Sequence, residues 1–319
     1  MNLGPASAAV TEARIHPLRE VSHAELAKLV GRPLRSVQQV RGGLTNTLHK
    51  VVTDAGAAYA VKHYASGREA FDAELATLTL LHGTLPVPAV VHADAALPVI
   101  VYHWVDGITL QQLRTHGPAD GFASIADQLG RLLAELARTD ATEPYELTSI
   151  LERTYTQLVD GRARGRIGAA MADAIYRGLT AREPELAFGA VCLAHGDLGH
   201  RNVIVHKTAL GAWEVSGLID WEGTTTSSPL QDLGSLFRDL DRYDPAFVES
   251  FARGYRAAGG QLPANWLLLG RLLDATWLVD ALDDERIEPA LLADCRRLLA
   301  RLVAEMAGEA DPFAYRAPG

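Results

Sequence analysis

Three polar side chains within one short stretch have the types and spacing that phosphoryl transfer requires. The run H-G-D-L-G-H-R-N is followed by I-D-W-E, and together they contain Asp197, Asn202 and Asp220. Val203–Val205 and Val215–Ile219, separated by a Gly-centred turn, predict a hairpin that brings the three to the same end. One carboxylate there could accept the proton of an attacking hydroxyl. An amide and a second carboxylate are hard oxygen ligands suited to Mg²⁺.

The same motifs resemble those of a known group of kinases. H-G-D-x-x-x-x-N followed by I-D is similar to the catalytic-loop and metal-binding motifs of protein kinases. With Trp221 and Glu222 completing I-D-W-E, the stretch resembles the aminoglycoside phosphotransferase/choline kinase family of small-molecule kinases. The resemblance implies that Asp197 orients and deprotonates the acceptor hydroxyl. It also implies that Asn202 and Asp220 hold Mg²⁺.

Two other interpretations of this stretch stay open at this point. His195, Asp197 and His200 could belong to a metal-hydrolase site, because His and Asp are both zinc ligands. No further His/Asp cluster with ligand spacing accompanies them. Alternatively, the polar residues could simply cap the strands of a structural hairpin. Matching elements upstream weaken both alternatives.

The first matching element is a lysine on a predicted strand, followed by a helix. Lys62 lies in the strand predicted over Ala58–Tyr64 and resembles the kinase V-A-I-K lysine, which contacts the α- and β-phosphates. The helix predicted over residues 66–82 has an apolar stripe formed by Phe71, Leu75, Leu78 and Leu81. Glu74 falls within this stripe, whereas Glu69 points elsewhere. A buried carboxylate needs a partner, so Glu74 is predicted to pair with Lys62.

The second matching element is the loop G-G-L-T-N between two predicted strands. Paired glycines let backbone amides approach phosphate oxygens without a Cβ in the way. The loop has no G-x-G-x-x-G motif, and a plain hairpin turn remains an alternative. The family's corresponding loop implies nucleotide contacts from Gly43, Thr45 and Asn46.

The pattern changes from strands to helices after the apolar run Val99–Trp104. The resemblance places an adenine-binding hinge at residues 102–107, where backbone groups of His103 and Val105 would contact the base. It also gives His195 and Asp232 a structural role, in which Asp232 accepts hydrogen bonds from backbone amides of the catalytic loop.

The expected fold is α+β, a bilobal protein-kinase-like fold. A small lobe over residues 1–101, built on a five-stranded, mainly antiparallel sheet and with 1–20 as a loosely held extension, would bind nucleotide. Ser22 and Glu25 form a capping-box pattern that predicts the start of a short helix. A mainly helical lobe over residues 108–319 would carry the catalytic hairpin and the acceptor site. The basic run at residues 161–166 is expected to be a solvated connection, with a substrate or phosphate contact as the alternative. Further helices are predicted over residues 147–159, 169–181, 245–258, 264–284 and 289–307.

The helix predicted over residues 264–284 is the candidate for the acceptor site. It is apolar almost all round, which predicts that it is buried. Trp266 and Trp277 share a stripe that continues into Asp280. Aromatic walls beside a carboxylate suit a sugar ring or an amine-bearing ligand, so these three residues, with Glu222, are candidate substrate contacts. The alternative is that the tryptophans are core and the aspartates mark the exit of the helix into solvent.

Composition bounds the class of protein. The formal charge of −9 over 319 residues argues against non-specific nucleic-acid binding, and it would favour cationic small molecules. Cys192 and Cys295 are expected to be reduced thiols of a cytoplasmic protein. The N-terminus lacks the pattern of a secretory signal, and polar residues and prolines interrupt the most apolar region, Pro86–Val105. Neither a membrane nor a nucleic-acid partner is therefore expected.

These observations predict a phosphotransferase with an alcohol group as acceptor, using Mg²⁺ and ATP or GTP. The resemblance makes an antibiotic the leading acceptor, either an aminoglycoside or another sugar-bearing compound, with resistance by inactivation. Metabolic alcohols such as choline, homoserine or sugars remain open, as does the choice between monomer and homodimer. A nucleotide-binding pseudokinase is disfavoured because Asp197, Asn202 and Asp220 are intact. A protein-kinase role is disfavoured because no A-P-E segment follows Asp220.

Overall fold

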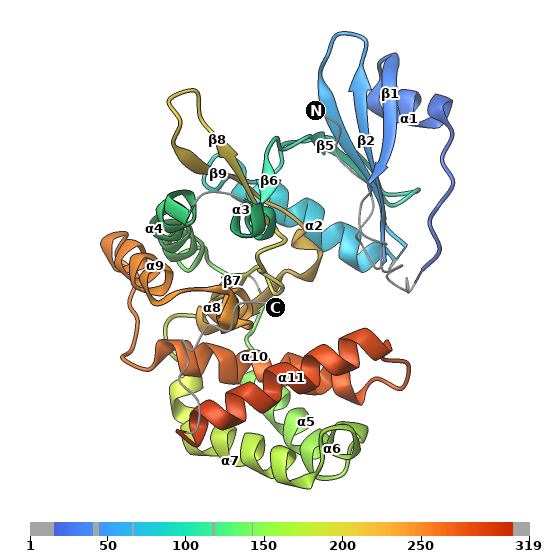
Figure 1. Ribbon diagram of the computed structural model, residues 1–319. Coiled ribbons are helices and arrows are strands. Elements are labelled where there is room, and N and C mark those ends of the chain that lie inside the picture. Colours follow the sequence, from blue (N-terminus) through green and yellow to red (C-terminus); the bar gives the residue numbers. More distant parts are fainter. Residues whose placement is uncertain (1–15, 41–44, 66, 117–118, 142, 309–319) are drawn as a thin grey trace. The chain divides into compact units, whose positions relative to one another are not determined.

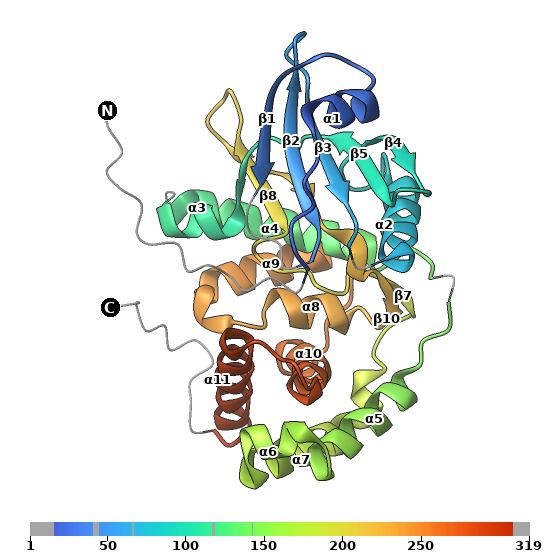
Figure 2. The same ribbon diagram turned by 90° about the vertical axis from the view of Figure 1, so that its right-hand side faces the viewer.

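The computed structural model describes residues 16–40, 45–65, 67–116, 119–141 and 143–308. The chain divides into two compact units (Figures 1 and 2). The first unit comprises Met1–Leu80 and Pro88–Trp104, and the second comprises Leu81–Val87 and Val105–Gly319.

The first unit is built on a five-stranded antiparallel sheet, as predicted, with the strand order β1-β2-β3-β5-β4. The strands are β1 (Leu34–Val40), β2 (Thr47–Thr53), β3 (Ala58–His63), β4 (Val90–Asp94) and β5 (Val99–His103). Helix α1 (His23–Val30) begins with the capping box that Ser22 and Glu25 predict. Alternate residues of β2 are buried, and Val51 packs with Leu26 of α1 in one apolar cluster. One face of the sheet is therefore closed by α1.

The opposite face of the sheet carries Lys62 and receives helix α2 (Arg68–Leu81). This follows from strand alternation, because Val61 belongs to the α1 cluster while its neighbour Lys62 points the other way and reaches Glu74 of α2. The helix predicted over residues 66–82 is thus present, and Phe71, Leu78 and Leu81 of its apolar stripe are buried.

The second unit is mainly helical and contains two small sheets. Its helices are α3 (Leu110–His116), α4 (Ala119–Leu136), α5 (Leu147–Val159), α6 (Arg162–Ile167), α7 (Ala169–Leu186), α8 (Leu230–Leu236), α9 (Pro245–Ala257), α10 (Trp266–Asp283) and α11 (Pro289–Met306). One sheet joins β6 (Ile108–Thr109), β8 (Val203–Lys207) and β9 (Trp213–Leu218), and the other joins β7 (Cys192–Ala194) and β10 (Thr225–Ser227). Short 3₁₀ turns follow at η1 (Trp221–Gly223) and η2 (Leu240–Arg242).

Helix α4 supports the β8–β9 hairpin. The Gln128 side chain donates to the carbonyl oxygen of Trp213 over 2.8 Å and accepts from the backbone N–H of Val215 over 3.0 Å. It thus occupies backbone groups of the exposed edge of β9. On its other side α4 crosses α9 with the backbones in contact, since a Cβ on Gly130 would lie 2.1 Å from the carbonyl oxygen of Phe251. The hairpin is therefore attached to a closely packed helix pair.

Helix α10 runs through the middle of the helical region, between α8 and the group formed by α5, α6 and α7, with α11 alongside (Figures 1 and 2). Within α10 only Trp277 and Asp280 are exposed. The prediction that this helix is largely buried is confirmed.

The basic run at residues 161–166 differs from the sequence prediction. It forms helix α6 rather than a solvated connection, and Arg166 donates to the carbonyl oxygens of Leu282 and Asp284 at the end of α10. The last carbonyls of a helix lack partners within the helix, so an arginine is a suitable donor there. Helix α7 also continues past the predicted end at Ala181 and through Pro184, because Leu186 in its last turn is fully buried.

No helix among the described residues combines the length and apolar character needed to cross a bilayer.

Candidate active site

The loop after β7 carries Asp197, and a buried carboxylate holds this loop in place. Asp232, in the first turn of α8, accepts hydrogen bonds from the backbone N–H groups of His195 over 2.8 Å and Gly196 over 3.0 Å. These are the contacts predicted for Asp232. Gly196 has φ 82°, and a Cβ there would lie 2.0 Å from the carbonyl oxygen of Gly223, so the turn requires glycine. Burial raises the pKa of Asp232, while the neighbouring His195 and the hydrogen bonds from the backbone N–H groups of His195 and Gly196 act in the opposite direction.

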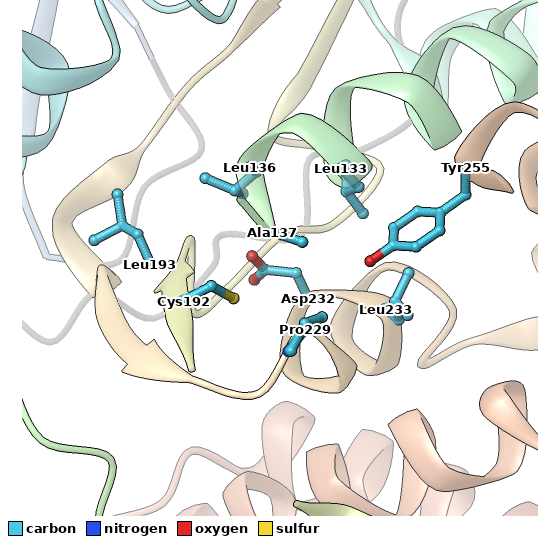
Figure 3. Close-up of a pocket in the computed structure, with 9 residues that line it drawn as sticks. All are labelled: Leu133, Leu136, Ala137, Cys192, Leu193, Pro229, Asp232, Leu233 and Tyr255. Carbon is cyan, nitrogen blue, oxygen red and sulfur yellow. The ribbon is translucent and has the colours of Figure 1, made fainter. Parts of the chain in front are cut away.

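A small cavity lies behind this loop, next to Asp232 (Figure 3). Its volume of about 10 Å³ is close to the minimum that holds one water molecule. The hydroxyl of Tyr255 points toward Asp232 across it (Figure 3). Burial raises the pKa of the Cys192 thiol in its wall to about 12, so this cysteine stays protonated. The cavity thus belongs to the buried region that supports the loop, and it is too small to hold a substrate.

His195 connects the catalytic loop to the segment that bears Asp220. Its Nε2 lies 2.9 Å from the carbonyl oxygen of Ile219, and because a carbonyl only accepts, Nε2 is the protonated nitrogen. The imidazole also packs against Trp221, with ring centroids 4.5 Å apart. Trp221 is itself fixed by donation from its Nε1 to the carbonyl oxygen of Leu218 over 2.8 Å. His195 is fully buried, consistent with a supporting position.

Asn202 joins the three motif residues into one unit. Its side-chain Nδ2 donates to the backbone carbonyl oxygen of Asp197 over 2.9 Å. Its backbone carbonyl oxygen accepts from the backbone N–H of Ile219 over 3.0 Å. Val203 pairs with Leu218 in the hairpin, so Asn202 and Asp220 leave the sheet at the same end, as predicted. Because the amide nitrogen is used for Asp197, the orientation of the side chain presents Oδ1 as the atom for a cation.

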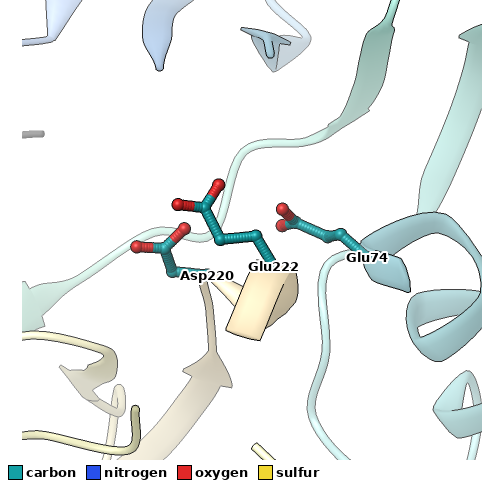
Figure 4. Close-up of side chains that lie close together, drawn as sticks. All are labelled: Glu74, Asp220 and Glu222. Atoms are coloured by element: carbon teal, nitrogen blue, oxygen red, sulfur yellow. The ribbon is translucent and has the colours of Figure 1, made fainter. Parts of the chain in front are cut away.

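Asp220 has an unusual backbone conformation. With φ 70° and ψ 58° it is the one non-glycine residue with positive φ in the described part of the chain. Such a conformation costs free energy and is found preferentially at functional sites. Carboxylate oxygens of Asp220 and Glu222 lie within 4.8 Å of each other. Figure 4 shows these two side chains, and it also draws Glu74 of the first unit.

The carboxylate of Asp197 faces an arginine that the sequence analysis missed. Nη1 of Arg238 lies 3.5 Å from Asp197 Oδ1. Two other nitrogens of Arg238 form a bidentate pair with Asp274, each over 2.8 Å. The surrounding protein removes water from around Asp197 and raises its pKa, while Arg238 and His195 act in the opposite direction. A detectable signal existed, since Asp274 is a carboxylate within an apolar helix, the same pattern that identified Glu74.

The predicted pair of Lys62 and Glu74 is confirmed. Lys62 Nζ lies 2.6 Å from Glu74 Oε2, and both side chains are buried. Glu69 is exposed, as the helix-face argument requires. Tyr64, the residue directly after β3, donates from its hydroxyl to the same oxygen over 2.6 Å. Burial and the charge of Glu74 raise the pKa of Tyr64, so the hydroxyl keeps its proton.

The loop between β1 and β2 contains three residues predicted to contact the nucleotide, and the structure describes two of them. Gly43 lies outside the described residues, and Thr45 is partly buried in the bend before β2. The side-chain oxygen of Asn46 accepts from the backbone N–H of Ala65 over 3.0 Å, which is a structural contact.

At the predicted hinge, the ring of His103 packs against Tyr59 in a tilted arrangement, with ring centroids 5.0 Å apart. The backbone N–H of His103 donates to the carbonyl oxygen of Ala89 over 2.9 Å. Val105 is the first residue of the second unit after β5. Nucleotide contact by His103 and Val105 stays a prediction.

The three α10 candidates for the acceptor site have different environments. Trp266 is only 6% exposed and packs on Phe237 and Phe251, with ring centroids 5.4 Å and 5.8 Å apart, so it is a core residue rather than a substrate contact. Trp277 is 39% exposed. Asp280 does not simply mark an exit into solvent, because it accepts from Nε2 of Gln157 over 2.8 Å.

Comparison with known proteins identifies the family. The model of the phosphotransferase enzyme family matches residues 36–267. No curated protein sequence matches the chain. Solved structures with a similar fold include choline kinase LicA from Streptococcus pneumoniae, at 17% identity and TM-score 0.64, which covers 88% of this chain and 97% of that one.

Two further structures belong to antibiotic phosphotransferases. The GDP complex of an aminoglycoside 2′-phosphotransferase IIIa mutant has 17% identity and TM-score 0.71 and covers 90% of this chain and 99% of that one. Macrolide 2′-phosphotransferase MphH from Brachybacterium faecium has 16% identity and TM-score 0.64 and covers 86% and 96%, respectively. At these identities the structures establish the kinase-like α+β fold. Since the family model spans more than half of the chain, the protein belongs to the phosphotransferase enzyme family and is a small-molecule kinase with an alcohol group as acceptor.

Proposed function

We propose that this protein transfers the γ-phosphoryl group of ATP or GTP, with Mg²⁺, to a hydroxyl of a small molecule, and that Asp197 is the catalytic base. The observation that carries the proposal is the hydrogen bond from Asn202 Nδ2 to the carbonyl oxygen of Asp197. It connects the proposed base and a proposed metal ligand within one loop, which is the positioning that phosphoryl transfer requires of a protein.

The donor set after the loop fits magnesium. Asn202 and Asp220 offer an amide oxygen and a carboxylate, the hard ligands that Mg²⁺ prefers. The hydrogen bond of the Asn202 amide nitrogen turns its oxygen away from Asp197, and hydrogen bonding of the neighbouring Ile219 fixes the backbone before Asp220. When bound there with the nucleotide, Mg²⁺ would neutralise charge on the phosphate oxygens.

Asp197 would receive the proton of the attacking hydroxyl. Its side chain is exposed, so an acceptor can reach it, and partial loss of hydration within the loop raises its pKa. A carboxylate with a raised pKa is a stronger proton acceptor than an ordinary aspartate. The hydrogen bonds that Asp232 accepts from the loop would keep this carboxylate in place during the reaction.

Lys62 would contact the α- and β-phosphates. The Lys62 ammonium group and the Tyr64 hydroxyl both donate to Oε2 of Glu74, which limits the directions in which Lys62 can extend. In this proposal residues 1–101 form the nucleotide-binding lobe and residues 102–107 the hinge. Residues 108–319 form the catalytic lobe, which also binds the acceptor.

For the acceptor we propose an antibiotic or another sugar-bearing compound, which phosphorylation would inactivate. Support comes from the structural neighbours, whose names include aminoglycoside and macrolide phosphotransferases. A metabolic alcohol is the second candidate, because a choline kinase has a similar TM-score.

The test is a screen for nucleotide consumption against a panel of antibiotics and metabolic alcohols, with mass spectrometry to detect a phosphate adduct. We expect Mg²⁺-dependent phosphorylation of at least one panel member and none by Asp197→Asn. Equal adduct formation by that variant would contradict the proposed base. Absence of Mg²⁺–nucleotide binding would contradict the function as a whole.

A further inference from the structure

The exposed part of α10 lies next to the catalytic loop. Trp277 and Asp280 are the exposed residues of this helix, and they are one turn apart. The guanidinium carbon of Arg238 lies 4.4 Å from the centroid of the Trp277 ring. The same guanidinium is 3.5 Å from the Asp197 carboxylate. Trp277 is therefore separated from the proposed base by a single planar group.

An acceptor that presents a hydroxyl to Asp197 would place its next atoms near Trp277. At 39% exposure the indole offers apolar area to a bound molecule. Sugar rings are suited to this kind of surface, because their C–H faces are apolar while their hydroxyls remain free to form hydrogen bonds.

Two carboxylates next to this surface, Asp274 and Asp280, are paired with arginines. Asp274 is only 1% exposed as a side chain, and its charge is matched by the bidentate contact with Arg238. Asp280 lies 3.3 Å from Arg153 of α5. A cationic ligand that approached Asp280 would also meet the positive charge of Arg153, and one that approached Asp197 would meet Arg238. These pairs reduce the negative charge that this surface presents to a cation.

A buried amide beside Asp280 provides an independent indication of a ligand. Gln157 is 8% exposed, and its Nε2 is used for Asp280. Its Oε1 is buried and has no hydrogen-bond partner among the described residues. Because the carboxylate of Asp280 only accepts, the amide orientation is set and Oε1 is the acceptor. An unpaired buried acceptor is costly, and a hydroxyl donor from a bound molecule would satisfy it.

We propose that Trp277, Arg238, Arg153 and Gln157 form an acceptor surface on which arginines pair with the neighbouring Asp274 and Asp280, and that it selects a neutral, ring-bearing polyol over a polycation. This inference rests on the proposed function, since it specifies the substrate class of the same site. Trp277 is the stacking residue, Gln157 receives a hydroxyl, and Arg153 and Arg238 disfavour ammonium groups.

The first experiment compares ligands of equal size and different charge. The probes are methyl glucoside with its 2-amino-2-deoxy counterpart, and maltotriose with kanamycin. Binding is measured by calorimetry in the presence of Mg²⁺ and a non-hydrolysable ATP analogue, and turnover by nucleotide consumption with ATP. We expect the neutral member of each pair to bind more tightly. Trp277→Ala should weaken that binding on the order of tenfold, and Trp277→Phe should retain most of it.

The second experiment removes the positive charge that is paired with the Asp280 carboxylate. Arg153→Gln removes the charge that compensates Asp280 and leaves the aspartate in place. We expect this variant to shift selectivity toward the amino sugar and kanamycin by several-fold, with the nucleotide KM unchanged. Arg177→Gln, which removes an exposed arginine of α7, is the matched control and should leave selectivity unchanged.

The outcomes distinguish the two proposals. Preference of the wild-type protein for kanamycin or the amino sugar would overturn the acceptor inference and leave the phosphotransferase function intact. Neutral-probe binding that does not depend on Trp277, or no binding of any neutral probe, would also overturn it. Binding of Mg²⁺–nucleotide without turnover on any acceptor would count against the proposed function, and the calorimetric comparison would then still decide the acceptor class.

Discussion

The Glu74 carboxylate accepts hydrogen bonds from the Lys62 ammonium and the Tyr64 hydroxyl at one and the same oxygen, each over 2.6 Å. All three side chains are buried. A buried ion pair contributes little net stability compared with apolar residues, but loss of one partner leaves an uncompensated charge. The pair is therefore better understood as a device for orienting Lys62 than as a source of stability.

Replacing either partner should reveal strong coupling. Lys62→Met and Glu74→Gln should each lower the free energy of unfolding by about 3–5 kcal/mol, and the double variant by less than the sum. The losses in kcat/KM should be non-additive in the same way. Chemical denaturation and steady-state kinetics measure both quantities. Glu69→Gln, on the exposed face of α2, is the control and should change neither; additive losses would contradict the coupling.

Asp197→Asn should reduce kcat by a factor on the order of 10²–10⁴, because it removes the proton acceptor and keeps the shape of the side chain. Nucleotide affinity should change little, since Asp197 is proposed to contact the acceptor rather than the phosphates. Steady-state kinetics and nucleotide titration separate these effects. Turnover close to that of the wild-type protein would remove Asp197 from the mechanism.

Asp220→Asn should weaken nucleotide binding only when Mg²⁺ is present. Asparagine tolerates the left-handed backbone found here but lacks the charge that binds a hard cation. We expect Mg²⁺–nucleotide affinity to fall on the order of tenfold or more and binding in EDTA to stay the same. Glu214→Gln, an exposed carboxylate of β9, is the control. Unchanged Mg²⁺ dependence in Asp220→Asn would mean that the metal binds elsewhere.

Stability should depend on pH through His63. Its side chain is 5% exposed and its Nδ1 has no hydrogen-bond partner among the described residues. Burial, assisted by Arg19 and His49, lowers the pKa of His63 from 6.5 to about 4. The unfolded chain therefore binds a proton at His63 more tightly than the folded chain does. The contribution of His63 to the free energy of unfolding is complete above pH 6.5 and is lost as the pH falls toward 4. The loss should reach up to about 3 kcal/mol.

Denaturation at a series of pH values tests this expectation. His63→Gln should show a smaller decrease in stability between pH 6.5 and 4 than the wild-type protein. His49 and His200 also have lowered pKa values and contribute in the same direction, so the difference between the two proteins isolates His63. His92→Gln removes an exposed histidine and should keep the full wild-type dependence. Equal pH dependence in His63→Gln and the wild-type protein would contradict the proposal.

The sequence by itself was sufficient wherever the relevant contacts are local or periodic. The spacing of Asp197, Asn202 and Asp220 around a hairpin is a local property, and the hairpin places their backbones as predicted. The position of Glu74 within an apolar stripe required a buried partner, and Lys62 on the preceding strand was the nearest candidate. The same reasoning predicted the five-stranded sheet, the capping box of α1 and the burial of α10.

Contacts between distant segments were decided only by the tertiary structure. Arg238 meets both Asp197 and Asp274, and Gln157 of α5 meets Asp280 of α10; periodicity along one helix cannot specify which other helix supplies the partner. A helical wheel likewise placed Trp266 and Trp277 on one stripe. Packing against α8 and α9 buries Trp266, while Trp277 remains exposed beside Arg238. The separation arises because a long helix passes different neighbours along its length, so residues that share its face need not share an environment.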